Sequence, residues 1–168
     1  AGMSMTAAQS ATAAGLYTEA SANAVLAANN SLLAAEAARD AGQIALASQL
    51  GRVSVVTTKT RMYTMPLLEH FNIAQFFEIV TGRENVQNPK PHPEPILITL
   101  EQMNYDKNLH DVWMIGDTKL DLIAANEANI NSIGVLCGYG EEDEIREYTQ
   151  FIQKDAISAI NFLKNLEN

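Results

Sequence analysis

Short apolar runs alternate with helix-like segments from residue 53 onward, and this alternation limits the fold more than any other feature. Strands are predicted at 53–57, 78–82, 112–115 and 132–136, with a brief edge strand at 151–152. Helices are predicted at 61–70, 95–104, 118–128, 141–148 and 156–166. Strands that alternate with helices indicate an α/β fold with a mostly parallel sheet and helices on both faces.

The sequence also predicts where two of these helices begin or end and which residues of one face the core. Pro66 lies inside the first, so that helix either starts there or kinks there. In the helix at 118–128, the predicted inner face consists of Leu120, Ile123, Ala124 and Ala128. Asn129 is placed to end that helix, because asparagine tolerates the left-handed conformation found just past helix ends.

Residues 1–52 differ from the rest of the chain, since more than a third of them are alanine. Alanine favours helix, so we predict an Ala-rich helical segment with helices near 4–28 and 31–50, closed by Gly51. We therefore divide the chain into 1–52 and an α/β core over 53–168. The first segment is expected to serve as a scaffold, or as a helical hairpin through which copies of the chain form a homo-oligomer.

Net charge and cysteine content limit the classes of binding partner and the cellular compartment that the sequence favours. The formal net charge is −9 and the pI is about 4.7, which disfavours nucleic acid and anionic membranes. A small phosphorylated ligand stays compatible, because a local pocket can be positive on an acidic protein. Cys137 is the only cysteine, no stretch of 18 uninterrupted apolar residues occurs, and the start lacks a secretory signal pattern. These features together predict a cytoplasmic protein.

Polar groups suited to chemistry follow three of the predicted segments. Asp117 comes directly after the apolar run at 112–115 and Gly116, and Asp121 lies one helical turn later. Carboxylates at the end of a parallel strand are where open α/β sheets bind ligands, and two of them suit Mg²⁺. Thr57 and Thr58 end the strand at 53–57.

The third group is Lys90, which sits in a loop stiffened by four prolines at alternate positions between 89 and 95. A hydroxyl, an ammonium group and Mg²⁺ together can hold and neutralise a phosphoryl group. Each part alone is more often structural, and it is their order and spacing that point to a phosphate site.

The residues that carry these groups resemble a known family. The matching segments are Val-Val-Thr-Thr-Lys at 55–59, Val-Gln-Asn-Pro-Lys-Pro-His-Pro-Glu-Pro at 86–95, Met-Ile-Gly-Asp-Thr-Lys-Leu-Asp-Leu-Ile-Ala-Ala at 114–125, and the Gly-Tyr-Gly after the fourth strand. Over residues 53–168 the chain resembles the haloacid dehalogenase (HAD) superfamily, in particular its phosphoglycolate-phosphatase-like branch. The resemblance implies a Rossmann-like fold and Mg²⁺-dependent hydrolysis of small phosphorylated metabolites.

The resemblance also implies a role for each polar residue. Thr57, with Thr58 beside it, would hydrogen-bond the phosphoryl oxygens, and Lys90 would balance their charge. Asp117 would ligate Mg²⁺ directly, and Asp121 would support the metal site from beside or behind it. Thr57, Lys90 and Asp117 are thus the expected catalytic residues.

One family feature is missing from residues 1–52. Members of the superfamily begin with an apolar strand that ends in Asp-x-Asp-Gly-Thr, whose first aspartate is the nucleophile and whose second is the general acid/base. Asp40 is the only aspartate in this segment, and no strand-like run precedes it. The missing strand is the central one in the family's sheet, between the strands that lead to Thr57 and Asp117.

Three explanations stay open at this stage. The first segment is foreign, in a fragment or chimera, or the sequence assigned to it is unreliable. Alternatively, the two flanking strands close up, or accept a strand from another chain, in a non-catalytic relative. The sequence therefore favours one of two functions: a Mg²⁺-dependent phosphatase whose turnover is impaired without the nucleophile, or a non-catalytic binding or oligomerising protein.

Overall fold

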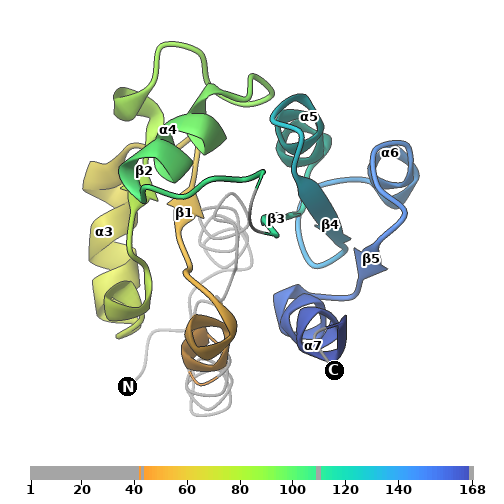
Figure 1. Ribbon diagram of the computed structural model, residues 1–168, viewed down its shortest axis with the longest axis horizontal. Helices are drawn as coiled ribbons and strands as arrows, with labels where there is room; N and C mark the ends of the chain where they lie inside the picture. The colour runs from red at the N-terminus through yellow and green to blue at the C-terminus, as the bar shows by residue number, and fades with distance from the viewer. Residues whose placement is uncertain (1–41, 43, 109–110, 167–168) are drawn as a thin grey trace, which may run out of the picture.

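The computed structural model describes residues 42, 44–108 and 111–166 (Figure 1). After helical residues 44–50, the chain forms strand β1 (Val55–Val56), helix α3 (Arg61–His70), the 3₁₀ turn η1 (Ala74–Phe76), β2 (Val80–Thr81), the 3₁₀ turn η2 (Arg83–Asn85), α4 (Glu94–Gln102), β3 (Trp113–Gly116), α5 (Lys119–Glu127), β4 (Asn131–Val135), α6 (Glu142–Arg146), β5 (Ile152–Gln153) and α7 (Ala156–Leu166). The predicted α/β fold is confirmed, with each predicted strand and helix after residue 53 present within a few residues of its expected bounds.

The strands form two parallel sheets instead of one. β1 pairs with β2, and Val55 lies opposite Val80. β3, β4 and β5 form the second sheet in that order, with Trp113 opposite Asn131. Figure 1 shows the first sheet with α3 and α4 on one side of the molecule and the second with α5, α6 and α7 on the other. Within the part of the chain that the structure describes, no strand joins β1 to β3.

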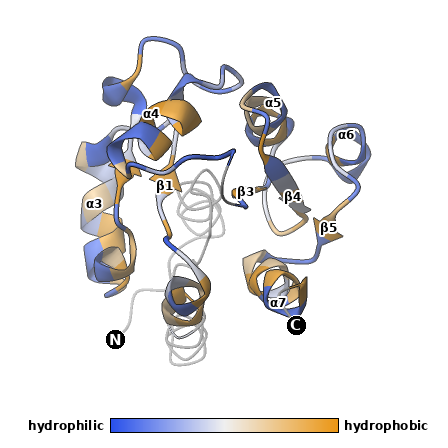
Figure 2. Ribbon diagram, viewed as in Figure 1, coloured by the Kyte–Doolittle hydropathy of each residue, from blue (hydrophilic) through white to orange (hydrophobic). Residues whose placement is uncertain are grey.

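Three hydrophobic clusters stabilise this arrangement. The first packs α3 and η1 against β1 and β2, the second joins β1 and β3 to α4 and α5, and the third packs β3 and β4 against α7 and residues 44–50. Figure 2 shows hydrophobic residues along β1 and β5, whereas the loop between β2 and α4 is mostly hydrophilic. The two halves of the molecule are therefore held together by side chains of the second and third clusters.

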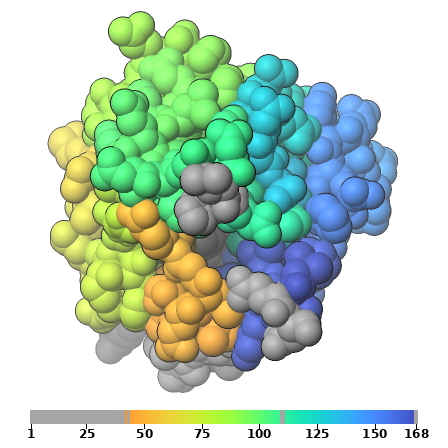
Figure 3. Space-filling model, in the orientation of Figure 1, coloured from red at the N-terminus to blue at the C-terminus, as the bar shows by residue number. Residues whose placement is uncertain are grey.

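The helical residues 44–50 belong to the packed core. Ile44 is fully buried in the first cluster, and Ala47 and Leu50 pack beside Ile160 of α7 in the third. Figure 3 shows this segment (orange) near the C-terminal helix (dark blue). The predicted helix over 31–50 is confirmed for this part. The rest of it, the helix at 4–28 and the homo-oligomer hairpin lie outside the described residues, and the division at residue 52 stays a prediction.

The structure also tests the finer helix predictions. α3 begins at Arg61 and continues through Pro66, so Pro66 does not start it. Asn129 has a φ of 54° just past α5, as expected of a helix-ending asparagine. The predicted inner face of α5 is wrong in part: Leu120 is exposed, whereas Asp121 and Leu122 are buried. The helix begins at the sheet's end, and its first turn points a carboxylate inward.

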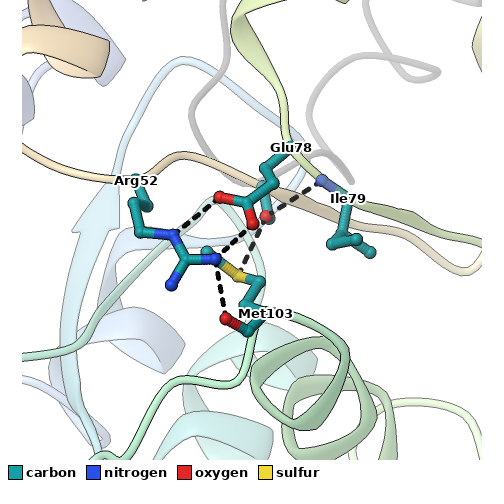
Figure 4. Close-up of polar contacts among 5 residues, drawn as sticks. Arg52, Glu78, Ile79 and Met103 are labelled. Atoms are coloured by element: carbon teal, nitrogen blue, oxygen red, sulfur yellow. Dashed lines mark hydrogen bonds and ion pairs between the residues drawn. The ribbon is translucent and has the colours of Figure 1, made fainter.

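Arg52 ties three segments together at the start of β1 (Figure 4). Its Nε donates to Glu78 Oε2 at 2.7 Å, and its Nη2 donates to the Met103 carbonyl at 2.7 Å and to Glu78 Oε1. Its guanidinium also lies 5.5 Å from the centre of the Tyr105 ring. This pairing lowers the pKa of Glu78, chiefly through the hydrogen bond to Arg52.

Among residues 42, 44–108 and 111–166, no helix combines the length and hydrophobicity required to cross a bilayer.

Candidate functional site

Asp117 lies at the carboxyl end of β3, where the chain turns into α5. Its side chain is fully buried, and its Oδ2 accepts a hydrogen bond from the backbone N–H of Tyr139 at 3.0 Å. The turn after β4 wraps closely around it, because a Cβ on Gly138 would lie only 2.0 Å from Asp117 Oδ2. Glycine at this position therefore allows the backbone to contact the carboxylate directly.

Asp121 occupies the first turn of α5 and faces the same end of the sheet. Its Oδ2 accepts hydrogen bonds from the Thr118 backbone N–H at 3.1 Å and from Thr118 Oγ1 at 2.8 Å. Gly116 makes room for it, since a Cβ there would lie 2.2 Å from the Asp121 Cβ. This contact shows that Asp121 packs directly on the last residue of β3, beside Asp117.

Lys90 connects the two halves of the molecule at this end. Its side chain is almost fully buried, and its Nζ donates to the Val56 carbonyl at 3.0 Å and forms an ion pair with Asp121 Oδ1. Val56 is the last residue of β1, and Asp121 lies beside the last residue of β3. The carboxyl ends of β1 and β3 therefore lie on the same side of the molecule, with the ammonium group of Lys90 between them.

Thr57 follows β1 directly and is also buried. Its Oγ1 accepts a hydrogen bond from the Lys59 backbone N–H at 3.1 Å, which shapes the turn after the strand. Thr58 is partly buried in the same turn. The structure thus brings the turn that carries Thr57 and Thr58, the ammonium group of Lys90 and the two aspartates to one end of the sheet, although their roles stay predictions.

The donor set agrees with Mg²⁺ better than with a fully caged metal ion. Among the described residues, no three His, Cys, Asp or Glu side chains gather as a metal-binding cluster. Mg²⁺ usually keeps several waters and takes only one or two carboxylates, with phosphate completing its shell. Asp117, a buried carboxylate at a strand end, fits that pattern. Asp121 already accepts bonds from Lys90 and Thr118, which favours a supporting position.

Two contacts in the site were not predicted. The Thr118–Asp121 hydrogen bonds could have been read from Thr-Lys-Leu-Asp at 118–121, because Thr-x-x-Asp is a helix-start pattern. The ion pair between Lys90 and Asp121 joins residues 31 positions apart, and no local sequence pattern predicts it.

The electrostatic influence of Asp117 reaches the loop after β4. Burial raises the pKa of the Cys137 thiol, and the negative charge of Asp117 raises it further. Although Cys137 is exposed as a residue, its sulfur is desolvated by its neighbours. The thiol therefore stays protonated at neutral pH, which disfavours a nucleophilic role for it.

Comparison with known proteins yields one family. The sequence model described as Haloacid dehalogenase-like hydrolase matches residues 44–135. Phosphoglycolate phosphatase of Colwellia psychrerythraea (strain 34H / ATCC BAA-681) is 33% identical over 107 residues, which are 64% of this chain and 46% of that protein. Phosphoglycolate phosphatase of Escherichia coli (strain K12) is 37% identical over 93 residues, or 55% of this chain and 36% of that protein. The chain thus spans less than half the length of these curated relatives.

Solved structures share the fold. A predicted phosphatase from Clostridium acetobutylicum superposes with a TM-score of 0.64 at 26% identity, covering 76% of this chain and 58% of that one. A haloacid dehalogenase-like family hydrolase from Streptococcus pneumoniae gives a TM-score of 0.63 at 21% identity over 74% of this chain and 58% of that one, which concerns the fold alone. Since the family's sequence model covers more than half of the chain, this protein belongs to the haloacid dehalogenase-like hydrolase family.

Proposed function

We propose that this chain carries the phosphate-binding and Mg²⁺-binding part of a phosphomonoesterase site, and that its hydrolytic turnover is impaired. The observation that carries the proposal is the position of Lys90, whose buried ammonium group lies between the end of β1 and Asp121. A cation fixed at the ends of two parallel strands, next to a threonine and a buried aspartate, suits a phosphoryl group.

Each residue has a distinct part in this proposal. Thr57 Oγ1 and Thr58 donate hydrogen bonds to phosphoryl oxygens, and Lys90 balances their charge. Bound at Asp117, Mg²⁺ would neutralise negative charge on the phosphoryl oxygens. Asp121 holds Lys90 in place through the ion pair and holds the start of α5 through Thr118.

The proposal of impaired turnover rests on the sequence of residues 1–52. That segment has no Asp-x-Asp motif, so no aspartate in it matches the family's nucleophile or general acid/base. The phosphoglycolate phosphatases similar to this chain suggest a small phosphorylated acid as ligand. The alternative, a protein that binds phosphate esters without hydrolysing them, has the same basis in the missing motif.

Binding and turnover should be measured separately on the full chain. We expect 2-phosphoglycolate binding by calorimetry to need Mg²⁺, and to fall at least tenfold in Lys90→Gln and Asp117→Asn. The exposed Lys154→Gln and Asp143→Asn variants are matched controls that should bind normally. Hydrolysis of p-nitrophenyl phosphate should be weak or undetectable. Folded protein that binds neither phosphoglycolate nor inorganic phosphate with Mg²⁺ would refute the proposal, whereas rapid Mg²⁺-dependent turnover would refute its second half.

A further inference from the structure

The loop between β2 and α4 carries the buried Lys90, although prolines limit the main-chain hydrogen bonds that this loop can make. Pro89, Pro91 and Pro93 have no N–H group and cannot donate one. The N–H of His92 donates to the Pro89 carbonyl at 3.0 Å and closes a turn around Lys90. Because the prolines remove three donors, side chains have a larger part in fixing this turn against the rest of the molecule.

Glu94, the first residue of α4, supplies such contacts. Its Oε1 accepts a hydrogen bond from the Gln87 backbone N–H at 2.7 Å. Its Oε2 accepts one from the Asn88 backbone N–H at 3.0 Å and one from Asn88 Nδ2 at 2.8 Å. The N–H of Glu94 in turn donates to His92 Nδ1 at 3.1 Å. One residue therefore binds the loop on both sides of Lys90, at Gln87 and Asn88 before it and at His92 after it.

Glu94 is suited to hold the loop because its own position is fixed. Helix α4 packs against β1 through Ile96 and Leu100, which lie with Val56 in the second cluster. The Glu94 side chain is only 20% exposed, and its negative charge lies in the first turn of α4, where the helix dipole favours an anion. Hydrogen bonds to its carboxylate, first that from the Gln87 N–H, lower the pKa of Glu94. The carboxylate is therefore charged at neutral pH.

The turn that Glu94 holds places Lys90 between the two halves of the molecule. Lys90 lies two residues after Asn88, and its Nζ bonds to the Val56 carbonyl and to Asp121. Burying a lysine costs both side-chain rotamer freedom and the hydration of its charge. The ammonium group therefore stays in this position only if the main chain of the loop is held close to its partners.

We infer that Glu94 is a positioning residue for Lys90. Its carboxylate holds the main chain at Gln87 and Asn88 against the start of α4, and the turn that follows then brings Lys90 Nζ to the ends of β1 and β3. Glu94 acts on a bound phosphoryl group through Lys90. That part of the inference rests on the proposed function, whereas the placement of Lys90 by Glu94 is measured without any ligand.

Acetylation of lysine amines on the full chain, followed by peptide mass spectrometry, measures the placement of Lys90. In the unmodified chain Lys90, which is 2% exposed, should react far more slowly than the exposed Lys154 in the same molecule. Glu94→Gln replaces one acceptor oxygen by a donor that faces the N–H groups of the loop, so Lys90 should react roughly tenfold faster. Glu101→Gln makes the same change at an exposed position of α4 and should leave the rate unchanged.

Ligand binding distinguishes positioning from a general loss of stability. Under conditions in which circular dichroism shows folded protein, Glu94→Gln should weaken Mg²⁺-dependent 2-phosphoglycolate binding by about tenfold. Adding Glu94→Gln to Lys90→Gln should cause little further loss, because a residue that acts through Lys90 has no effect once the ammonium group is gone. A residue that only stabilised the fold would weaken binding by the same factor in both backgrounds.

If Glu94→Gln does not fold, Asn88→Ala decides: it removes only the Nδ2 bond to Glu94 and should speed Lys90 acetylation about threefold. Three results would overturn the inference. They are acetylation of Lys90 as fast as that of Lys154 in the unmodified chain, an unchanged Lys90 rate in folded Glu94→Gln or Asn88→Ala, and losses of binding that multiply in the double variant. A folded chain that binds no phosphoglycolate, yet shows faster Lys90 acetylation in Glu94→Gln, would refute the proposed function and support the positioning role.

Discussion

Replacing Lys90 by methionine should destabilise the fold strongly, apart from any effect on ligand binding. The Lys90 and Asp121 side chains are each only 2% exposed, and Lys90 is the cation that faces Asp121 Oδ1. Removing one partner of a buried ion pair leaves an uncompensated charge and costs about 3–5 kcal/mol. Asp121 keeps its two hydrogen bonds from Thr118, so the expected loss lies near the middle of that range, at about 4 kcal/mol.

Urea unfolding followed by circular dichroism measures this loss. With an m-value of about 2 kcal/mol/M, the midpoint should fall by about 2 M. The double variant Lys90→Met/Asp121→Asn removes both charges and should recover about 2 kcal/mol relative to the sum of the single changes. A single Lys90→Met change that costs less than about 1 kcal/mol, or single changes that simply add, would refute the conclusion that the pair is buried and coupled.

Two further predictions concern the turns around the aspartates. Because burial and the Asp117 charge raise the pKa of Cys137, iodoacetamide should alkylate it more slowly at pH 8 than it alkylates free cysteine, and Asp117→Asn should speed the reaction; equal rates in both proteins would show that the charge has no effect. Gly116→Ala would place a Cβ 2.2 Å from Asp121 Cβ and should lower the free energy of unfolding by about 1–3 kcal/mol, whereas Gly51→Ala, with no atom within 4 Å, should stay near wild type in thermal unfolding.

Most secondary structure could be predicted because the signals are local. In the described part of the chain, apolar runs ended by glycine or threonine located β1 to β4, and the Phe151-Ile152 pair located β5. Asn129 ended α5 as its tolerance of positive φ predicted. The inner face of α5 was harder to predict. Leu120 was expected inside because apolar residues usually are, but Asp121 is buried instead, since Lys90 and Thr118 satisfy its carboxylate.

The candidate site could be predicted in its members but not in its contacts. Asp117, Lys90 and Thr57 were recognised by residue type and order, and parallel strands then brought them to one end of the molecule. The position of α5 relative to the end of β3 decides whether Asp117 or Asp121 pairs with Lys90. Gly116 allows Asp121 to pack directly against the end of β3, and the sequence pattern alone does not reveal this contact.

The split sheet explains why Lys90 has so much influence in this fold. In an unbroken sheet, a ladder of main-chain hydrogen bonds holds neighbouring strands together, and a single side chain adds little. Here the described residues provide no ladder between β1 and β3, and Lys90 bonds to both halves beside the apolar packing of the second and third clusters. Apolar packing is non-directional, whereas the bonds of Lys90 to the Val56 carbonyl and to Asp121 are directional and connect the two strand ends. The residue proposed to balance a phosphate charge therefore also joins the carboxyl ends of β1 and β3.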